Sequence, residues 1–183
     1  MTILRRLLLA LAGLFGVLAV TGIDLNLERQ LPTTWAGTGA RDALSVVHDI
    51  HRVAAFAFVA TAVVTAIAAV TIARGAPGPL GRLGVGVGLL ACALLATGYL
   101  VEWDQLRLWA VTVGTDMMGF TPVFGDDVRY VQLGSTRLDL DRGSQSWWFV
   151  LHAGVLPVVA VGGGIALARA TRRRDRPVAS PAA

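Results

Sequence analysis

Residues 43–73 read ALSVVHDIHRVAAFAFVATAVVTAIAAVTIA, and beyond the first few turns this run is almost entirely apolar or small. A hydrocarbon core about 30 Å thick requires roughly 20 helical residues, so the run is long enough to cross a bilayer as one helix. Its polar beginning contains His48 and His51, and we expect it to project beyond the bilayer or to be buried against protein. The run predicts a helical membrane protein.

Three further apolar runs have the same property, and a short proline- and glycine-rich connection at 75–79 makes the second and third spans antiparallel neighbours. The chain is 55% hydrophobic, more than a soluble core of 183 residues accommodates. We therefore predict an all-α membrane protein, a bundle of four transmembrane helices forming one domain over residues 1–171, with a disordered tail at 172–183. The predicted spans are 7–23, 43–73, 80–101 and 147–168.

The charged residues exclude several classes of protein. All sixteen basic residues are arginine, and they stand at the ends of apolar runs rather than along one folded face, which argues against nucleic-acid binding. Cys92 is the single cysteine, so the chain has no internal disulfide, no four-thiolate metal site and no CxxCH motif for covalent haem attachment. Ionisable residues are absent from the middle of the spans, which disfavours a transporter or channel.

Arginine placement predicts the orientation. Nine arginines lie on the side that also holds both termini, so the positive-inside rule places both termini in the cytoplasm and the loops at 24–42 and 102–146 outside the cytoplasmic membrane. A cleaved signal peptide is the alternative for Arg5 to Val20, but no A-x-A site follows that run. The nine arginines are Arg5, Arg6, Arg74, Arg82, Arg169, Arg172, Arg173, Arg174 and Arg176.

Two of the three histidines are candidate ligands. His51 and His152 each lie one or two turns inside the outer end of a span that runs in the same direction, so we expect them to share one depth. Histidine in a membrane helix usually marks a function, and two imidazoles can supply both axial nitrogens of a haem iron. Gly22 and Gly98 lie near the same depth and would let the flat haem macrocycle approach the backbone. The alternative is that these histidines only form hydrogen bonds between helices.

The chain resembles the N-terminal, four-helix part of the cytochrome b and cytochrome b6 family of quinol-oxidising complexes. The most specific stretch is Gly98–Trp109, GYLVEWDQLRLW, which is followed by AVTV and then by TPVFGDDV. His51-Arg52 is similar to the HR pair of that family's second helix, and LHAGVLP at 151–157 is similar to its fourth-helix LH-x-x-x-LP.

The resemblance implies haem b, and departures from the family pattern imply one haem rather than two. The family's ligand helices each carry a second histidine fourteen residues further on, where this chain has Thr65 and Ala166. His51 and His152 would thus hold a single non-covalent haem on the outer side. The family also has basic residues, which help to neutralise the haem propionates, where this chain has Val47 and Trp147.

The propionate partners remain open among Arg52, Arg41, Arg107 and Arg129. His48 is a further candidate, as a propionate partner, a proton carrier or a ligand in place of His51, because it lies three residues away on a similar helix face. Met117 and Met118 are alternative ligands, although an outward loop favours apolar contacts for them.

A bis-histidine iron has no open position, which favours electron transfer over oxygen chemistry. We therefore expect a mono-haem subunit of a larger complex that exchanges electrons between membrane quinol and an extracytoplasmic redox partner. Trp103 to Pro122 would face a quinone, Glu102 would accept a quinol proton, and the loop at 114–146 would dock the partner. The alternative is a haem-free scaffold or anchor subunit of a respiratory complex.

Overall fold

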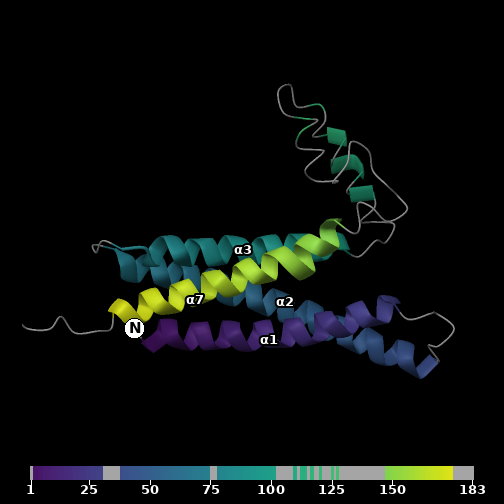
Figure 1. Ribbon diagram of the computed structural model, residues 1–183, viewed down its shortest axis with the longest axis horizontal. Helices are drawn as coiled ribbons and strands as arrows, with labels where there is room; N and C mark the ends of the chain where they lie inside the picture. Colours follow the sequence, from purple (N-terminus) through teal and green to yellow (C-terminus); the bar gives the residue numbers. More distant parts are fainter. Residues whose placement is uncertain are drawn as a thin grey trace, which may run out of the picture. The chain divides into compact units, whose positions relative to one another are not determined.

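The computed structural model describes residues 2–30, 38–74, 78–101, 109–110, 112–114, 116–117, 120, 125, 127 and 147–174. Its elements are α1 (Thr2–Gln30), α2 (Thr38–Ala73), α3 (Leu80–Val101), the π-helical turn η2 (Val150–Val155) and α7 (Leu156–Arg174). Figure 1 labels the four α-helices. Within these ranges, four helical segments are long and apolar enough to cross a membrane. The predicted fold class, an all-α protein with four membrane helices, is confirmed.

Most of the helices extend beyond the apolar runs. α1 already includes Arg5 and Arg6, and α2 begins at Thr38, five residues before the predicted span. α7 continues to Arg174, so the helix includes residues 172–174, the first three of the segment that the sequence predicts as a tail. Residues 175–183 lie outside the described ranges. Arginine can stay helical past the apolar run because its stem packs along apolar surface while its charged group reaches water.

The chain divides into two compact units. Unit 1 comprises residues 1–92 and 160–183, and unit 2 comprises residues 93–159. Unit 1 thus contains α1, α2, the first part of α3 and most of α7. Unit 2 contains the end of α3 and the segment that leads through η2 into α7.

Within unit 1, α1 and α2 run antiparallel and pack along most of their length. Thr21 near the end of α1 meets His51 near the start of α2, and the rings of Phe15 and Phe58 lie 6.2 Å apart between centroids in the middle of the pair. Because residues later in α1 contact residues earlier in α2, the two helices run in opposite directions.

The α2–α3 interface of unit 1 is built from small residues. Gly81 faces Ala73, Gly84 faces Ala69, and Gly88 faces Ala66. At Gly84 an added Cβ would collide with the Cβ of Ala69, so this glycine is required for the close approach of the two helices. Membrane helices lack a hydrophobic driving force for association. Small residues let their backbones approach closely, and the resulting van der Waals packing stabilises the pair. The predicted antiparallel pairing of spans two and three is confirmed.

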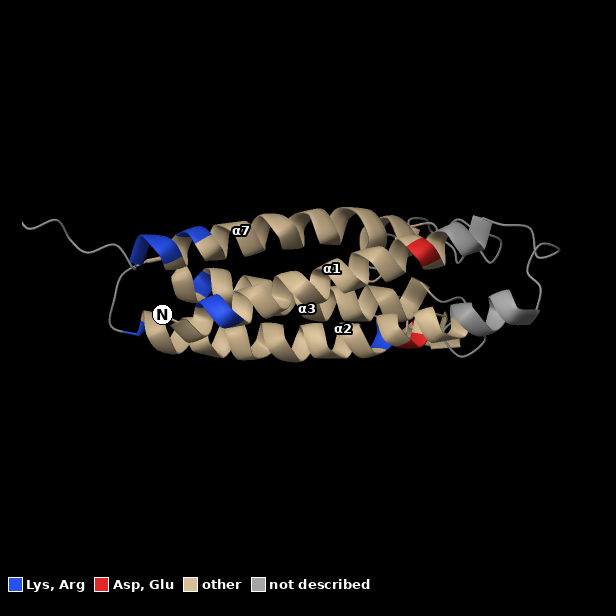
Figure 2. Cartoon of the chain, turned by 90° about the horizontal axis from the view of Figure 1, so that it is seen from below, with Lys and Arg blue, Asp and Glu red and all other residues tan. Residues whose placement is uncertain are grey.

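One end of unit 1 is basic. Leu4, Ala69, Leu80 and Leu167 form a buried cluster that joins all four helices at the beginning of α1 and α3 and toward the end of α2 and α7. The arginines of these helix ends therefore gather there, whereas red acidic positions appear at the opposite ends of α1 and α2 in Figure 2. The described arginines at the basic end are Arg5, Arg6, Arg74, Arg82, Arg169, Arg172, Arg173 and Arg174.

Candidate functional site

His51 of unit 1 lies on α2 and packs against the last turns of α1. Its Nδ1 is 2.8 Å from the hydroxyl oxygen of Thr21, and the ring is partly buried. The neighbouring residue is Gly22, where an added Cβ would lie 3.4 Å from Cε1 of the His51 ring. The structure thus places the His51 imidazole beside Gly22, and the glycine provides room for that ring.

His152 of unit 2 has the same surroundings on other helices. Its Nδ1 is 3.1 Å from the hydroxyl oxygen of Thr97 on α3, and its ring lies directly on Gly98. An added Cβ at Gly98 would be 2.7 Å from Cε1 of His152, which is shorter than real Cβ contacts. Gly98 is therefore a residue that the position of His152 requires.

The two threonines determine which nitrogen of each ring bears hydrogen. A threonine hydroxyl has one hydrogen to donate. Thr21 lies 2.8 Å from the carbonyl oxygen of Val17, and Thr97 lies 2.8 Å from that of Ala93, so each hydroxyl donates to its own helix. Each oxygen then accepts from the histidine, whose Nδ1 must carry the hydrogen. The lone pair is on Nε2, the nitrogen that a neutral imidazole with a bonded Nδ1–H presents to a metal.

His152 lies within η2, a π-helical turn whose backbone hydrogen bonds span five residues instead of the four of an α-helix. Pro157 has no backbone N–H, so the carbonyl of Ala153 lacks the partner that a regular α-helix would provide. The N–H of Leu156 bonds instead to the carbonyl of Leu151, five residues back. Single π-helical turns inside α-helices are rare and frequently occur at functional sites.

Trp148 contributes a buried hydrogen-bond donor in the same unit. Its side chain is 9% exposed, and its indole N–H has no hydrogen-bond partner among the described residues. A buried donor of this kind is costly unless a bound group accepts its hydrogen bond. Trp148 precedes His152 by about one helical turn, so an acceptor on a group held near His152 would account for this N–H.

The other predicted site residues differ in what the structure describes. Arg52 is exposed, and its guanidinium lies 3.8 Å from the carboxylate of Asp49, an exposed pair of small energetic value. His48 is partly buried on α2. Glu102 lies outside the described residues, as does most of the predicted quinone-facing segment and most of the predicted docking loop.

The positions that the family resemblance associates with a second haem have other roles here. Thr65 of α2 is fully buried and donates its hydroxyl to the carbonyl of Thr61 at 2.7 Å. Sequence reasoning had not selected Thr21, Thr97 or Trp148. The sequence did contain a signal for the two threonines. Each directly precedes a glycine that had been identified as a candidate, as Thr21-Gly22 and Thr97-Gly98.

Comparison with known proteins finds a matching family model and several relatives. A family model described as cytochrome b(N-terminal)/b6/petB matches residues 82–176, just over half of the chain, including Gly98 and His152. The chain is 32% identical over 74 residues to cytochrome b6 of Heliobacterium mobile, which is 40% of this chain and 34% of that protein. It is 33% identical over 76 residues to cytochrome b6 of Porphyra purpurea, covering 42% and 34% of the two chains.

A similar segment occurs in cytochrome b of Vicia faba, with 32% identity over 83 residues, 45% of this chain and 20% of that protein. The matches therefore span about a third or less of these relatives' own lengths. The family match over more than half of the chain, together with the four membrane helices, leads to one conclusion: the chain belongs to the cytochrome b(N-terminal)/b6/petB family.

Proposed function

We propose that the chain is a mono-haem b-type cytochrome subunit that exchanges electrons between membrane quinol or quinone and an extracytoplasmic redox partner within a larger complex. One observation carries the proposal: His51 and His152 each have Nδ1 at a threonine hydroxyl and a glycine beside the ring. This is the arrangement that orients an imidazole and strengthens it as an iron ligand.

Each residue has a defined task in this proposal. His51 and His152 would hold the haem iron through Nε2, and Thr21 and Thr97 would orient their rings. Gly22 and Gly98 leave room for the rings, and Trp148 supplies a buried hydrogen-bond donor to the bound group. The haem would supply a one-electron couple, and an iron held by two histidines would pass electrons rather than bind oxygen.

The number of haems follows from the residues available as ligands. In the positions fourteen residues beyond His51 and His152 the chain has Thr65 and Ala166, and the hydroxyl of Thr65 is already bonded to its own helix. We therefore infer one haem per chain. With a single haem the chain would not carry electrons across the bilayer alone, so both electron partners would act at the same side.

The remaining parts of the proposal concern the side of the membrane and the partners. The arginines at one end of unit 1 support an orientation in the cytoplasmic membrane with cytoplasmic termini. The end of α1 and the start of α2, where His51 lies, would then be outside. Glu102 is the proposed proton acceptor for quinol, and the segment from Trp103 to Pro122 is the proposed quinone-facing surface. Arg52, Arg41, Arg107 and Arg129 are the candidate propionate partners.

The test is a haem count and a visible spectrum of the purified chain. We expect a pyridine haemochrome value of one haem b per chain, and loss of the reduced b-type bands in His51→Ala and in His152→Ala. His48→Ala is the matched control and should keep the bands. Unchanged bands in either ligand variant would remove that ligand, and a count of two would overturn the single-haem proposal.

A haem-free scaffold subunit is the second candidate. One observation favours it, since the Thr21–His51 and Thr97–His152 contacts are also the interhelical hydrogen bonds that a structural histidine would form. The same spectrum decides between the two, because a scaffold purified from cells supplied with haem would show no b-type bands.

A further inference from the structure

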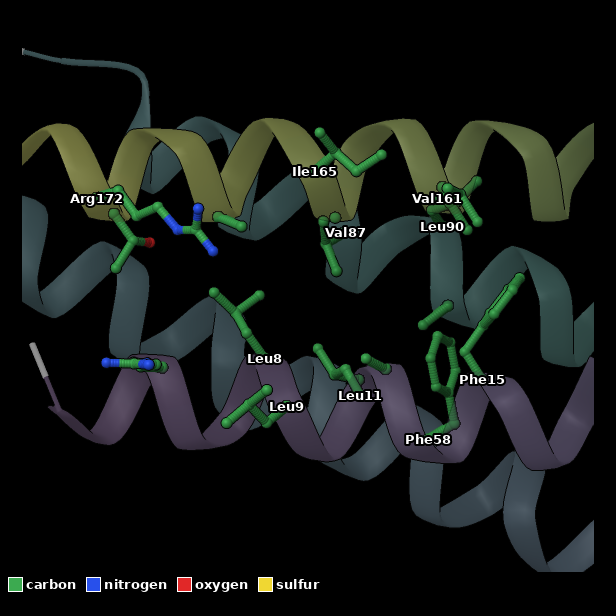
Figure 3. A pocket seen from close by; sticks show the side chains of 17 residues that line it. Leu8, Leu9, Leu11, Phe15, Phe58, Val87, Leu90, Val161, Ile165 and Arg172 are labelled. Atoms are coloured by element: carbon green, nitrogen blue, oxygen red, sulfur yellow. The ribbon is translucent and has the colours of Figure 1, made fainter.

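Unit 1 contains a cavity that the haem proposal does not use. It has a volume of about 600 Å³ and is formed mainly by α1 and α7, with α3 and Phe58 of α2 completing its walls. In Figure 3, Leu8 and Leu11 of α1 and Val87 of α3 point into the space between the helices. A volume of this size is in the range of small-molecule binding sites.

The two ends of the cavity differ chemically. Arg5 of α1 and Arg172 of α7 belong to its lining and stand at the basic end of unit 1. At the other end lie Phe15 and Phe58, and ten residues of α1, about 15 Å of helix, separate Arg5 from Phe15. Thr171 also belongs to the lining, but its hydroxyl is bonded to the carbonyl of Leu167. The cavity thus suits a molecule with one anionic end and a long apolar part.

The apolar part of the cavity borders an exposed apolar surface. Leu9 of α1 and Val161 and Ile165 of α7 line it and are 66%, 45% and 47% exposed. In a membrane, an acyl chain can therefore enter from the side between α1 and α7. The arginines at the end would then lie at the depth of the lipid headgroups, where arginine is strongly attracted to anionic lipid.

We propose that this cavity binds one anionic phospholipid, with an acyl chain against Leu8, Leu11 and Phe15 and the phosphate held by Arg5 and Arg172. Guanidinium groups bind phosphate through paired charge-assisted hydrogen bonds. Among the described residues, the lining contains no histidine, cysteine or methionine, so these side chains offer a haem iron no ligand. A quinone is neutral and would give the two arginines no charge to neutralise.

The experiment measures lipid selectivity of the full chain in nanodiscs. Spin-labelled phosphatidylglycerol and spin-labelled phosphatidylcholine are incorporated separately into phosphatidylcholine nanodiscs, and the fraction of immobilised label is measured by electron paramagnetic resonance. We expect phosphatidylglycerol to be preferred by roughly tenfold to thirtyfold, as two arginines acting on one phosphate would produce. Monodisperse elution in size-exclusion chromatography checks that each variant is folded.

Two matched pairs of variants test the two ends of the cavity. Arg5→Gln with Arg172→Gln removes the charges of the lining, and Arg6→Gln with Arg173→Gln removes the same charge from neighbouring arginines outside the lining. Gly164→Leu fills the cavity, and Gly162→Leu is its control, because an added Cβ meets nothing within 4 Å at either glycine and only Gly164 lines the cavity.

The proposal expects the preference to fall to near unity in Arg5→Gln/Arg172→Gln and immobilisation to be lost in Gly164→Leu, while both controls behave as the unsubstituted chain. Equal loss of preference in the two arginine pairs would show a general surface-charge effect and overturn the proposal. A cavity that immobilises both labelled lipids equally would also overturn it. These outcomes do not depend on haem, so they are independent of the proposed electron transfer.

Discussion

The hydroxyl of Thr97 forms hydrogen bonds to two groups, and the bond to His152 orients that ring. The hydroxyl donates to the carbonyl of Ala93 at 2.8 Å and accepts from the ring nitrogen at 3.1 Å. Thr21 does the same for His51. Because the hydrogen is used within the helix, the oxygen remains an acceptor, and the ring can present Nε2 to a ligand site without changing its tautomer.

Removing this acceptor should weaken the histidine as a ligand. Thr97→Val keeps the shape of the side chain but removes the hydroxyl, so the imidazole becomes less electron-rich. We expect the affinity for haem to fall roughly tenfold to hundredfold and the reduction potential of the haem to rise. Haem transfer to an apo-globin and a redox titration measure both effects.

Thr61→Val is the control, since among the described residues the Thr61 hydroxyl donates to the carbonyl of Ala57 on its own helix and not to a histidine. Thr21→Val should act in the same direction as Thr97→Val through His51. Equal haem transfer rates for Thr97→Val and the Thr61 control would show that Thr97 does not position the ligand.

The two glycines beside the histidines differ in how much room they leave. An added Cβ would lie 2.7 Å from the ring at Gly98 but 3.4 Å from it at Gly22. We expect Gly98→Ala to displace His152 and to lower haem content severely, and Gly22→Ala to lower it only slightly. Haem per chain after purification is the measurement, and Gly86→Ala, where nothing lies within 4 Å, is the control. A Gly98→Ala chain with full haem content would contradict the expectation.

At the scale of elements, the helices follow from apolar length, but their ends and irregularities depend on other contacts. The third predicted span, 80–101, agrees with α3 at both ends. The other helices are longer than predicted. Charged residues can extend a helix beyond its apolar run when their charged groups reach water or a protein partner. The π-helical turn could not be inferred from hydropathy, since it arises from a missing N–H at Pro157 together with the alternative bond from Leu156 to Leu151.

The π-helical turn should matter for the site it contains. Pro157→Ala restores a backbone N–H and allows regular α-helical bonds to form through 150–155. The change should rotate the segment around His152 and alter the electron paramagnetic resonance spectrum of the ferric haem. Pro79→Ala, at the start of α3, is the control and should leave the spectrum unchanged. An unaltered spectrum in Pro157→Ala would mean that the turn does not determine the histidine orientation.

At the scale of the whole molecule, charge predicts which way the chain lies in the membrane. In a Cys92→Ser background, Thr2→Cys and Ser45→Cys each place one exposed thiol at opposite ends of the unit 1 helices. We expect a membrane-impermeant maleimide to label Ser45→Cys in intact cells and Thr2→Cys only in inside-out vesicles. Labelling of Thr2→Cys in intact cells would reverse the proposed orientation.

The amino-acid sequence alone determined the membrane class, the four spans, the antiparallel pairing of spans two and three and the family resemblance. These depend on composition and spacing along one dimension. The histidines and glycines were found in the same way, because an ionisable residue in an apolar run is conspicuous.

Only the tertiary structure decided which side chains serve those histidines. Thr21 reaches His51 across thirty positions of the chain, and Thr97 reaches His152 across fifty-five. The cavity with Arg5 and Arg172 joins the first and last helices in the same way. A threonine or arginine looks ordinary in a linear sequence, and it acquires its role only when packing brings a particular partner within hydrogen-bonding distance.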